Sequence, residues 1–98
     1  MIIYISESTR LDKKWMAQTE GHRTVHFGQR GVSDFTVHRD EALRQAYIAR
    51  HGRKENWGGA GVMTPGWRSR HLLWEKRNLR AAAAAASAMY SDVRFRLT

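Results

Sequence analysis

Residues 14–27, KWMAQTEGHRTVHF, decide the fold because their pattern predicts a β-hairpin. Apolar and polar side chains alternate over residues 14–19 and again over residues 23–27, as in strands that bury one face. The connection between them, residues 20–22, is short and contains Gly21, which suits a tight turn. We therefore expect two antiparallel strands at the centre of the N-terminal half.

Short apolar segments near both ends of the chain extend this sheet. Residues 2–5, IIYI, are rich in β-formers and too brief for a helix. Residues 93–97 alternate, with Arg94 and Arg96 on one side of the expected strand and apolar side chains on the other. Residues 35–38 are a candidate for a further short strand.

A helix is expected after Asp40, whose carboxylate can accept hydrogen bonds from the N–H groups of the first turn. It would cover residues 41–51 and end at Gly52 in the left-handed conformation that favours glycine. The helical spacing gives it an apolar face made of Leu43, Ala46 and Tyr47.

Two more helices are expected in the C-terminal half. Thr64 followed by proline marks the start of one, with aromatic rings spaced along a single face at Trp67, His71 and Trp74. Asn78 can cap the other, over residues 79–90, which contains the run AAAAAASA.

These elements predict an α+β protein of 98 residues. A small antiparallel sheet, built on the N-terminal hairpin with the C-terminal strand as a further candidate member, would pack against two or three helices. Residues 1–80 are expected to form a single α+β domain. Residues 81–98, the Ala-rich helix and the terminal strand, would pack on that domain or on a partner.

The charge of the chain points to a negatively charged partner. Lys and Arg number 17 against 9 Asp and Glu, giving a net charge of +8, and most of the excess lies in residues 39–80. A field of this sign attracts nucleic acids, acidic membrane surfaces and acidic proteins. The alternative is that the charge serves only solubility.

Basic and aromatic residues gather around the glycine-rich segment 52–66 and the helix that follows it. Cations there could neutralise phosphates, and an exposed Trp57 could stack on a base. Alternatively, the tryptophans belong to the core and the arginines form a solvated helix face. The candidate residues for binding a polyanion or partner are Arg50, Arg53, Lys54, Trp57, Arg68, Arg70, Lys76 and Arg77.

Catalytic, metal and cofactor sites are not expected from the sequence. The absence of cysteine excludes disulfides and thiolate zinc sites, and the histidines lack partners at ligand spacing. A metal-dependent nuclease built on His38, Asp40, Glu55 and Asn56 is the weakest alternative, because these residues do not follow the usual hairpin-to-helix spacing.

Membrane insertion and secretion are not expected either. No apolar run approaches the roughly 20 residues that span a bilayer. The N-terminus, MIIYISESTR, lacks the features of a signal peptide. We therefore expect the protein inside a host cell, in cytoplasm or nucleus, or in a virion.

Two stretches of the sequence resemble a known family. These are residues 23–57, RTVHFGQRGVSDFTVHRDEALRQAYIARHGRKENW, and residues 64–76, TPGWRSRHLLWEK. They are similar to a family of small basic proteins encoded by large DNA viruses of algae and other protists. Arg68 and His71 depart from that pattern, which tends to have bulkier rings there. The resemblance implies a viral or algal context and no particular reaction.

Charge, motifs and resemblance together favour a non-enzymatic structural or binding protein of a large DNA virus. We expect a minor virion component that contacts larger viral proteins or a polyanion. The alternative is a non-specific nucleic-acid-binding protein that holds the sugar–phosphate backbone.

Overall fold

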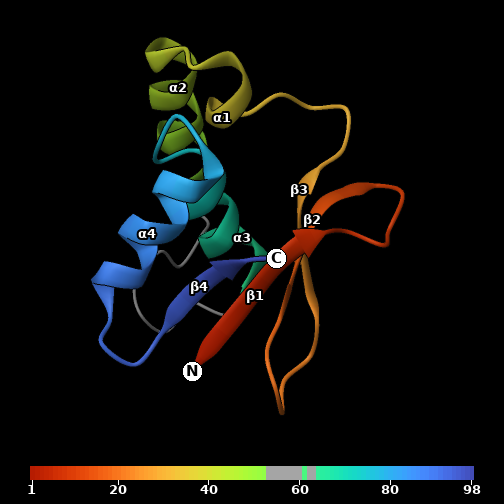
Figure 1. Ribbon diagram of the computed structural model, residues 1–98. Helices are drawn as coiled ribbons and strands as arrows, with labels where there is room; N and C mark the ends of the chain where they lie inside the picture. Colours follow the sequence, from red (N-terminus) through yellow and green to blue (C-terminus); the bar gives the residue numbers. More distant parts are fainter. Residues whose placement is uncertain (53–60, 62–63) are drawn as a thin grey trace.

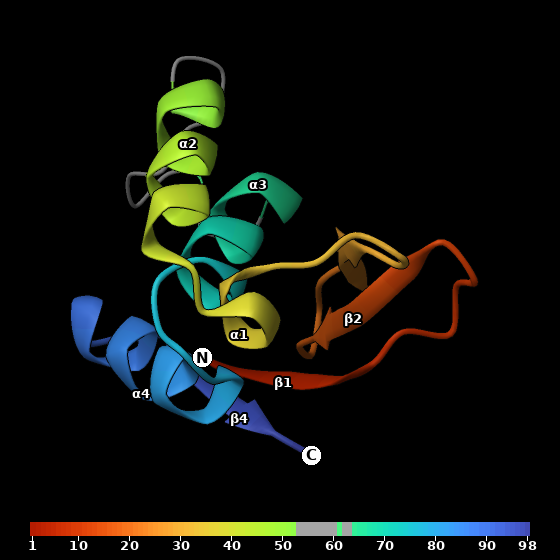
Figure 2. The same cartoon turned by 90° about the horizontal axis from the view of Figure 1, so that it is seen from above.

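The computed structural model describes residues 1–52, 61 and 64–98, in which a four-stranded sheet carries its helices on one side (Figures 1 and 2). The elements in chain order are β1 (Ile2–Glu7), β2 (Lys13–Gln18), β3 (Val25–Gln29), α1 (Phe35–His38), α2 (Glu41–His51), α3 (Pro65–Arg68), the π-helix η2 (Ser69–Leu73), α4 (Leu79–Met89) and β4 (Arg94–Leu97).

The sheet has the strand order β3-β2-β1-β4, which confirms the expected α+β class and the N-terminal hairpin. β1, β2 and β3 are antiparallel neighbours, whereas β4 joins the other side of β1 in parallel, with Ile3 opposite Phe95. Backbone bonds fix this pairing at both ends, from Arg94 N to Met1 O and from Thr98 N to Ile5 O, each 2.9 Å long. The first and last strands of the chain therefore lie side by side.

The core lies between the sheet and the helices. Alternate residues of the strands, including Ile3, Ile5 and Phe27, are buried on the covered face, where they meet Trp67 of α3. The small side chains of α4 let its backbone approach the sheet closely, and three of its alanines, Ala82, Ala83 and Ala86, belong to the same core. Residues 81–98 are therefore part of one packed unit with the rest.

Three side-chain caps fix where the longer helical segments begin, as the sequence predicts. Asp40 accepts from the backbone of α2, Thr64 from that of α3, and Asn78 from that of α4. The expected left-handed end at Gly52 is wrong, because Gly52 continues α2 with a φ of −59°. Arg39 adopts the left-handed conformation instead, with a φ of 56°, where it ends α1.

Residues 35–38 form the helix α1 and not the expected strand. Asp34 is responsible, because its nearly buried carboxylate accepts a 2.9 Å hydrogen bond from the backbone of Thr36. The same carboxylate forms a 2.6 Å ion pair with Lys14 of β2. This ion pair links the start of α1 to the sheet, a tertiary contact that local strand propensity does not report.

The expected apolar face of α2 is also wrong. Leu43 is 51% exposed and Ala46 is exposed, so only Tyr47 of that trio is buried. Arg44 turns inward instead: its Nε donates to the backbone oxygen of Trp74 over 2.7 Å, and its Nη2 lies 3.1 Å from Glu75 Oε2. A half-buried arginine that donates hydrogen bonds thus takes the place of a hydrophobic contact.

The helix expected after Thr64 changes character after one turn. α3 gives way at Ser69 to the wider turns of η2, and the helix ends at Trp74. Trp67 and His71 still share a face, with ring centroids 4.2 Å apart. The wider spacing releases Trp74 from that face, and its ring packs flat on Tyr47 at 4.2 Å with an interplanar angle of 3°.

The contact between Tyr47 and Trp74 is the centre of a stack of rings that holds α2 in place. His51 stacks on the other side of Tyr47, with centroids 4.4 Å apart, and His38 of α1 lies 5.3 Å from Trp74. Offset aromatic contacts of this kind each add about 0.5–1.5 kcal/mol beyond the burial of area. The position of α2 therefore depends on this stack and on Arg44.

We predict that Gly28→Ala destabilises the protein far more than Gly21→Ala. Both glycines have left-handed backbones, with φ of 76° and 78°, but a Cβ at Gly28 would lie 2.7 Å from the Cδ1 atom of buried Leu73, whereas a Cβ at Gly21 would meet nothing. Backbone strain alone costs about 1 kcal/mol, and overpacking raises the loss at Gly28 to about 3 kcal/mol. Urea unfolding followed by tryptophan fluorescence measures both; equal losses would show that the core accommodates the extra methyl group.

A second prediction concerns the acid dependence of stability. Burial raises the pKa of Glu75, but the hydrogen bonds and charges of Arg70 and Arg44 outweigh it and hold the pKa below 4.5. Because the folded-state pKa is lowered, this contribution to stability is present at neutral pH and disappears as the pH falls through the folded-state value.

Glu75→Gln should therefore lower the free energy of unfolding by about 1–2 kcal/mol at pH 7, and the difference from the wild type should shrink on acidification. Urea titrations between pH 7 and about pH 3 check this. Glu41→Gln is the matched control, since it removes the exposed second partner of Arg44 and should have a smaller effect. A constant difference at all pH values would contradict the assignment to Glu75.

Candidate binding cleft

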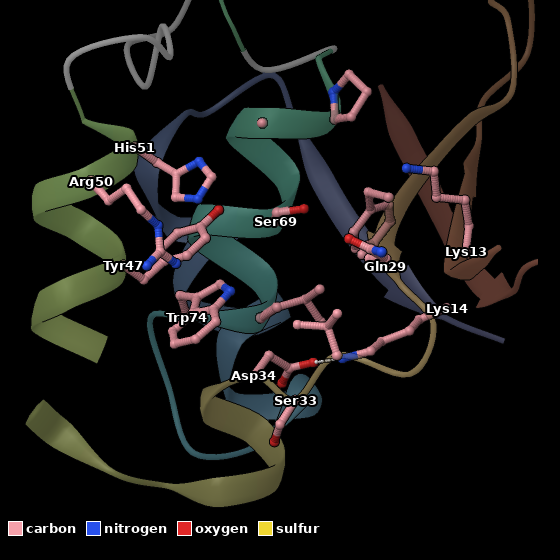
Figure 3. A pocket seen from close by; sticks show the side chains of 16 residues that line it. Lys13, Lys14, Gln29, Ser33, Asp34, Tyr47, Arg50, His51, Ser69 and Trp74 are labelled. Atoms are coloured by element: carbon pink, nitrogen blue, oxygen red, sulfur yellow. Dashed lines mark hydrogen bonds and ion pairs between the residues drawn. The ribbon is translucent and has the colours of Figure 1, made fainter. Parts of the chain in front are cut away.

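A cleft of about 370 Å³ opens between α2 and the β2–β3 edge of the sheet, with α3 and η2 at its back (Figure 3). Its volume is in the range of sites that hold small ligands or part of a larger one. Each wall belongs to an element whose position is fixed elsewhere: the strands by the sheet ladder and α2 by its aromatic stack. The cleft is therefore a product of the fold and not of one loop.

A cationic side chain stands on each wall of the cleft. Lys13 reaches toward it from β2, and Arg50 lines it from the last turn of α2, beside the His51 ring (Figure 3). Between them, the Ser69 hydroxyl of η2 and the Gln29 amide of β3 point toward one another (Figure 3). The arrangement presents donors and positive charge from three directions, which suits an anionic group.

Negative charge in the described lining comes from one residue, Asp34. Its carboxylate forms the 2.6 Å ion pair with Lys14 and also caps α1. The Asp34 and Lys14 charges therefore cancel at the lower end of the cleft, and Lys13 and Arg50 form no ion pair with a described residue. The upper part of the cleft keeps a net positive character.

Aromatic rings form part of the α2 side of the cleft. Tyr47 is buried and Trp74 half-buried, and both contribute to the lining while they stack on one another. Tyr47 is stacked between Trp74 and His51, so the rings form a rigid apolar wall of the cleft and not a platform for a base.

The residues predicted from the sequence do not form one surface. Arg50 lies at the cleft. Lys76 and Arg77 are exposed at a second hollow, which they share with Glu41 and Arg44 in the first turn of α2. The two positions lie at opposite ends of that helix. The candidates Arg53, Lys54 and Trp57 fall outside the described residues.

Arg68 and Arg70 belong to the interior rather than to a solvated helix face. Arg68 is 0% exposed, and burial lowers the pKa of its guanidinium to about 10, so that it remains a cation at neutral pH. Arg70 is 14% exposed and pairs with Glu75. The prediction that Arg68 binds a polyanion is wrong for this reason, and Arg70 is engaged in holding the helices together.

Sequence reasoning missed Lys13, His51 and the lining role of Tyr47. Lys13 and His51 are 38 positions apart, and only the packing of α2 beside the hairpin brings them to one cleft. A useful signal was present in the last turn of α2, where Arg50 and His51 follow each other. Basic residues at this place in a helix also suit the negative end of the helix dipole, so the pair alone does not indicate a cleft.

Four residues were considered for a metal-dependent nuclease, and the two that the structure describes, His38 and Asp40, have structural roles. Asp40 caps α2, and its backbone N–H donates to His38 Nδ1 over 2.9 Å. Glu55 and Asn56 lie outside the described residues. Within residues 1–52, 61 and 64–98, no three His, Asp or Glu side chains gather closely enough to hold a metal ion. No helix in this part of the chain is both long and apolar enough to span a membrane.

Comparison with known proteins places the chain in one family. No curated protein and no solved structure matches it significantly. The expected viral context therefore stays a prediction. One family, described as a family of unknown function (DUF5754), matches residues 3–51, which run from β1 to the end of α2 and include Lys13, Arg50 and His51. Because the match covers half of the chain, the protein belongs to this family of unknown function.

Proposed function

We propose that the protein is a non-enzymatic binding protein whose partner is a nucleic acid, held through its phosphates at the cleft. The observation that carries the proposal is the placement of Lys13 on one wall and of Arg50 and His51 on the other, with Asp34 already neutralised by Lys14. Phosphates bind where cations and hydrogen-bond donors converge without a competing carboxylate.

The charge of the chain favours a nucleic acid over a simple anion. Tyr47 and Trp74, which stack on one another, give the cleft a rigid apolar wall beside its cations. The net charge of +8 adds a long-range attraction that a polyanion uses better than a small ligand does.

The role expected from the resemblance, a minor component of a virus particle, stays a prediction. Trp57, one of the candidate residues for contact with a partner, lies outside the described residues. Genome association and incorporation into a particle are compatible with each other. The cleft supports the first of them through its cations, and nucleic-acid binding is accordingly the function proposed for this chain.

Arg50→Gln should weaken binding and make it less sensitive to salt. Fluorescence anisotropy of a labelled DNA duplex at several salt concentrations gives the slope of log K against log[salt], about −0.9 for each phosphate neutralised. Loss of one phosphate contact should reduce the magnitude of this slope by about 1.

Arg80→Gln is the matched control, because Arg80 is exposed on α4, away from the cleft, and its loss changes the net charge equally. The wild-type slope should persist in this variant. Equal effects of the two substitutions would assign binding to net charge and not to the cleft. A wild-type protein that binds no nucleic acid at low salt would overturn the proposed function.

A further inference from the structure

The face of the sheet opposite the helices is not covered by any described element. Its residues follow from the ladder register, since neighbours across a sheet point to the same side. Ile3 and Ile5 are buried against the helices, so Tyr4 between them points to the other side, where it is 39% exposed. We name this side the open face; it carries Ile2, Tyr4, Ser6, Met16, Gln18, His26, Arg94 and Arg96.

The open face combines a ring with two arginines. In the register, Tyr4 has Arg96 of β4 on one side and Gln18 of β2 on the other, and Arg94 lies opposite Ile2. Both arginines are exposed, and neither forms an ion pair with a described residue. Two residues along a strand span about 6.6 Å, so the arginines form a short positive row at the edge of an apolar surface.

Around Tyr4 the surface is partly apolar. Ile2 and Met16 are half-buried, and none of the eight residues of the open face is acidic. His26 is held in place by a 2.7 Å hydrogen bond between its Nδ1 and Ser8 Oγ. A sheet face that offers a ring, aliphatic neighbours and adjacent cations matches the needs of unpaired bases joined by phosphates.

We infer that the open face binds single-stranded nucleic acid, with a base stacked on Tyr4 and the adjoining phosphates held by Arg94 and Arg96. The inference rests on the proposed function and adds to it a second surface and a preference for unpaired strands. A duplex cannot use Tyr4 in this way, because its bases are already stacked on one another inside the helix. Duplex DNA would therefore depend on the cleft alone.

Substitution of the ring should separate the two kinds of nucleic acid. Tyr4→Leu should weaken binding of a labelled single-stranded oligonucleotide about fivefold or more, since stacking of one base contributes about 1–3 kcal/mol. Binding of the matching duplex should change by less than about twofold, because the base contact is absent there. Tyr4→Phe keeps the ring and should retain single-strand binding, while urea unfolding verifies that each variant is folded.

The arginine row has its own matched pair of variants. Arg96→Gln should weaken single-strand binding and reduce the salt slope by about 0.7, the value for one phosphate of a single strand. Arg80→Gln removes the same charge from α4 and should leave the slope unchanged. If the arginines only protect an edge strand, Arg96→Gln will instead promote aggregation without changing the affinity of the soluble protein, and the inference fails.

The outcomes distinguish this inference from the proposed function. If the wild type binds neither duplex nor single strand, both are overturned. If it binds both but Tyr4→Leu leaves single-strand binding unchanged, only the open-face inference is overturned. If light scattering shows a dimer that Tyr4→Leu converts to a monomer, the open face is an interface between copies of the chain, and the inference is likewise overturned.

Discussion

The flat contact between Tyr47 and Trp74 determines the shape of the helical half of the protein. Tyr47 is the buried residue of α2, and its ring lies 4.2 Å from that of Trp74 at the end of η2. Arg44 adds a hydrogen bond to the Trp74 backbone one turn earlier. Without these contacts α2 would lose its position beside the sheet, and the cleft would lose one wall. The candidate site therefore depends on the packing of Tyr47 on Trp74.

Much of the fold could be predicted from the sequence because its signals are local. The hairpin over residues 14–27 follows from alternation and a short glycine-containing connection, and Asp40, Thr64 and Asn78 cap the helices they precede. Two of the failed predictions, the strand over residues 35–38 and the apolar face of α2, involve a contact with a distant residue. The ion pair of Asp34 with Lys14 accompanies a helix where β-formers predicted a strand, and no window of neighbouring residues contains that contact.

The candidate site was harder to predict than the fold, because an arginine in sequence does not reveal whether it faces solvent. Arg50, Arg68 and Arg70 look alike as members of a basic segment, yet one lines a cleft, one is fully buried and one pairs with Glu75. The turn from α3 into η2 can shift only the side chains that follow Arg68, such as Arg70, because a wider helix departs from the 3.6-residue period from Ser69 onward. Arg68 lies before that turn, next to the buried Trp67, and the positive charge of the segment does not reveal that Arg68 is buried.

The placement of the acidic side chains explains how a chain with a net charge of +8 comes to have surfaces that are positively charged. Most carboxylates of the described residues are engaged near a cation of their own: Glu7 with Arg30, Asp12 with Arg10, Asp34 with Lys14, Glu41 with Arg44, and Glu75 with Arg44 and Arg70.

These ion pairs cancel the charges of side chains that are buried or that lie at the ends of helices and strands. The cations outside them include Lys13 and Arg50 at the cleft and Arg94 and Arg96 on the open face. Two surfaces on opposite sides of one sheet thus retain positive charge without acids to cancel it. A polyanion is attracted to such surfaces, whereas the same number of cations interspersed with free carboxylates would give little net field.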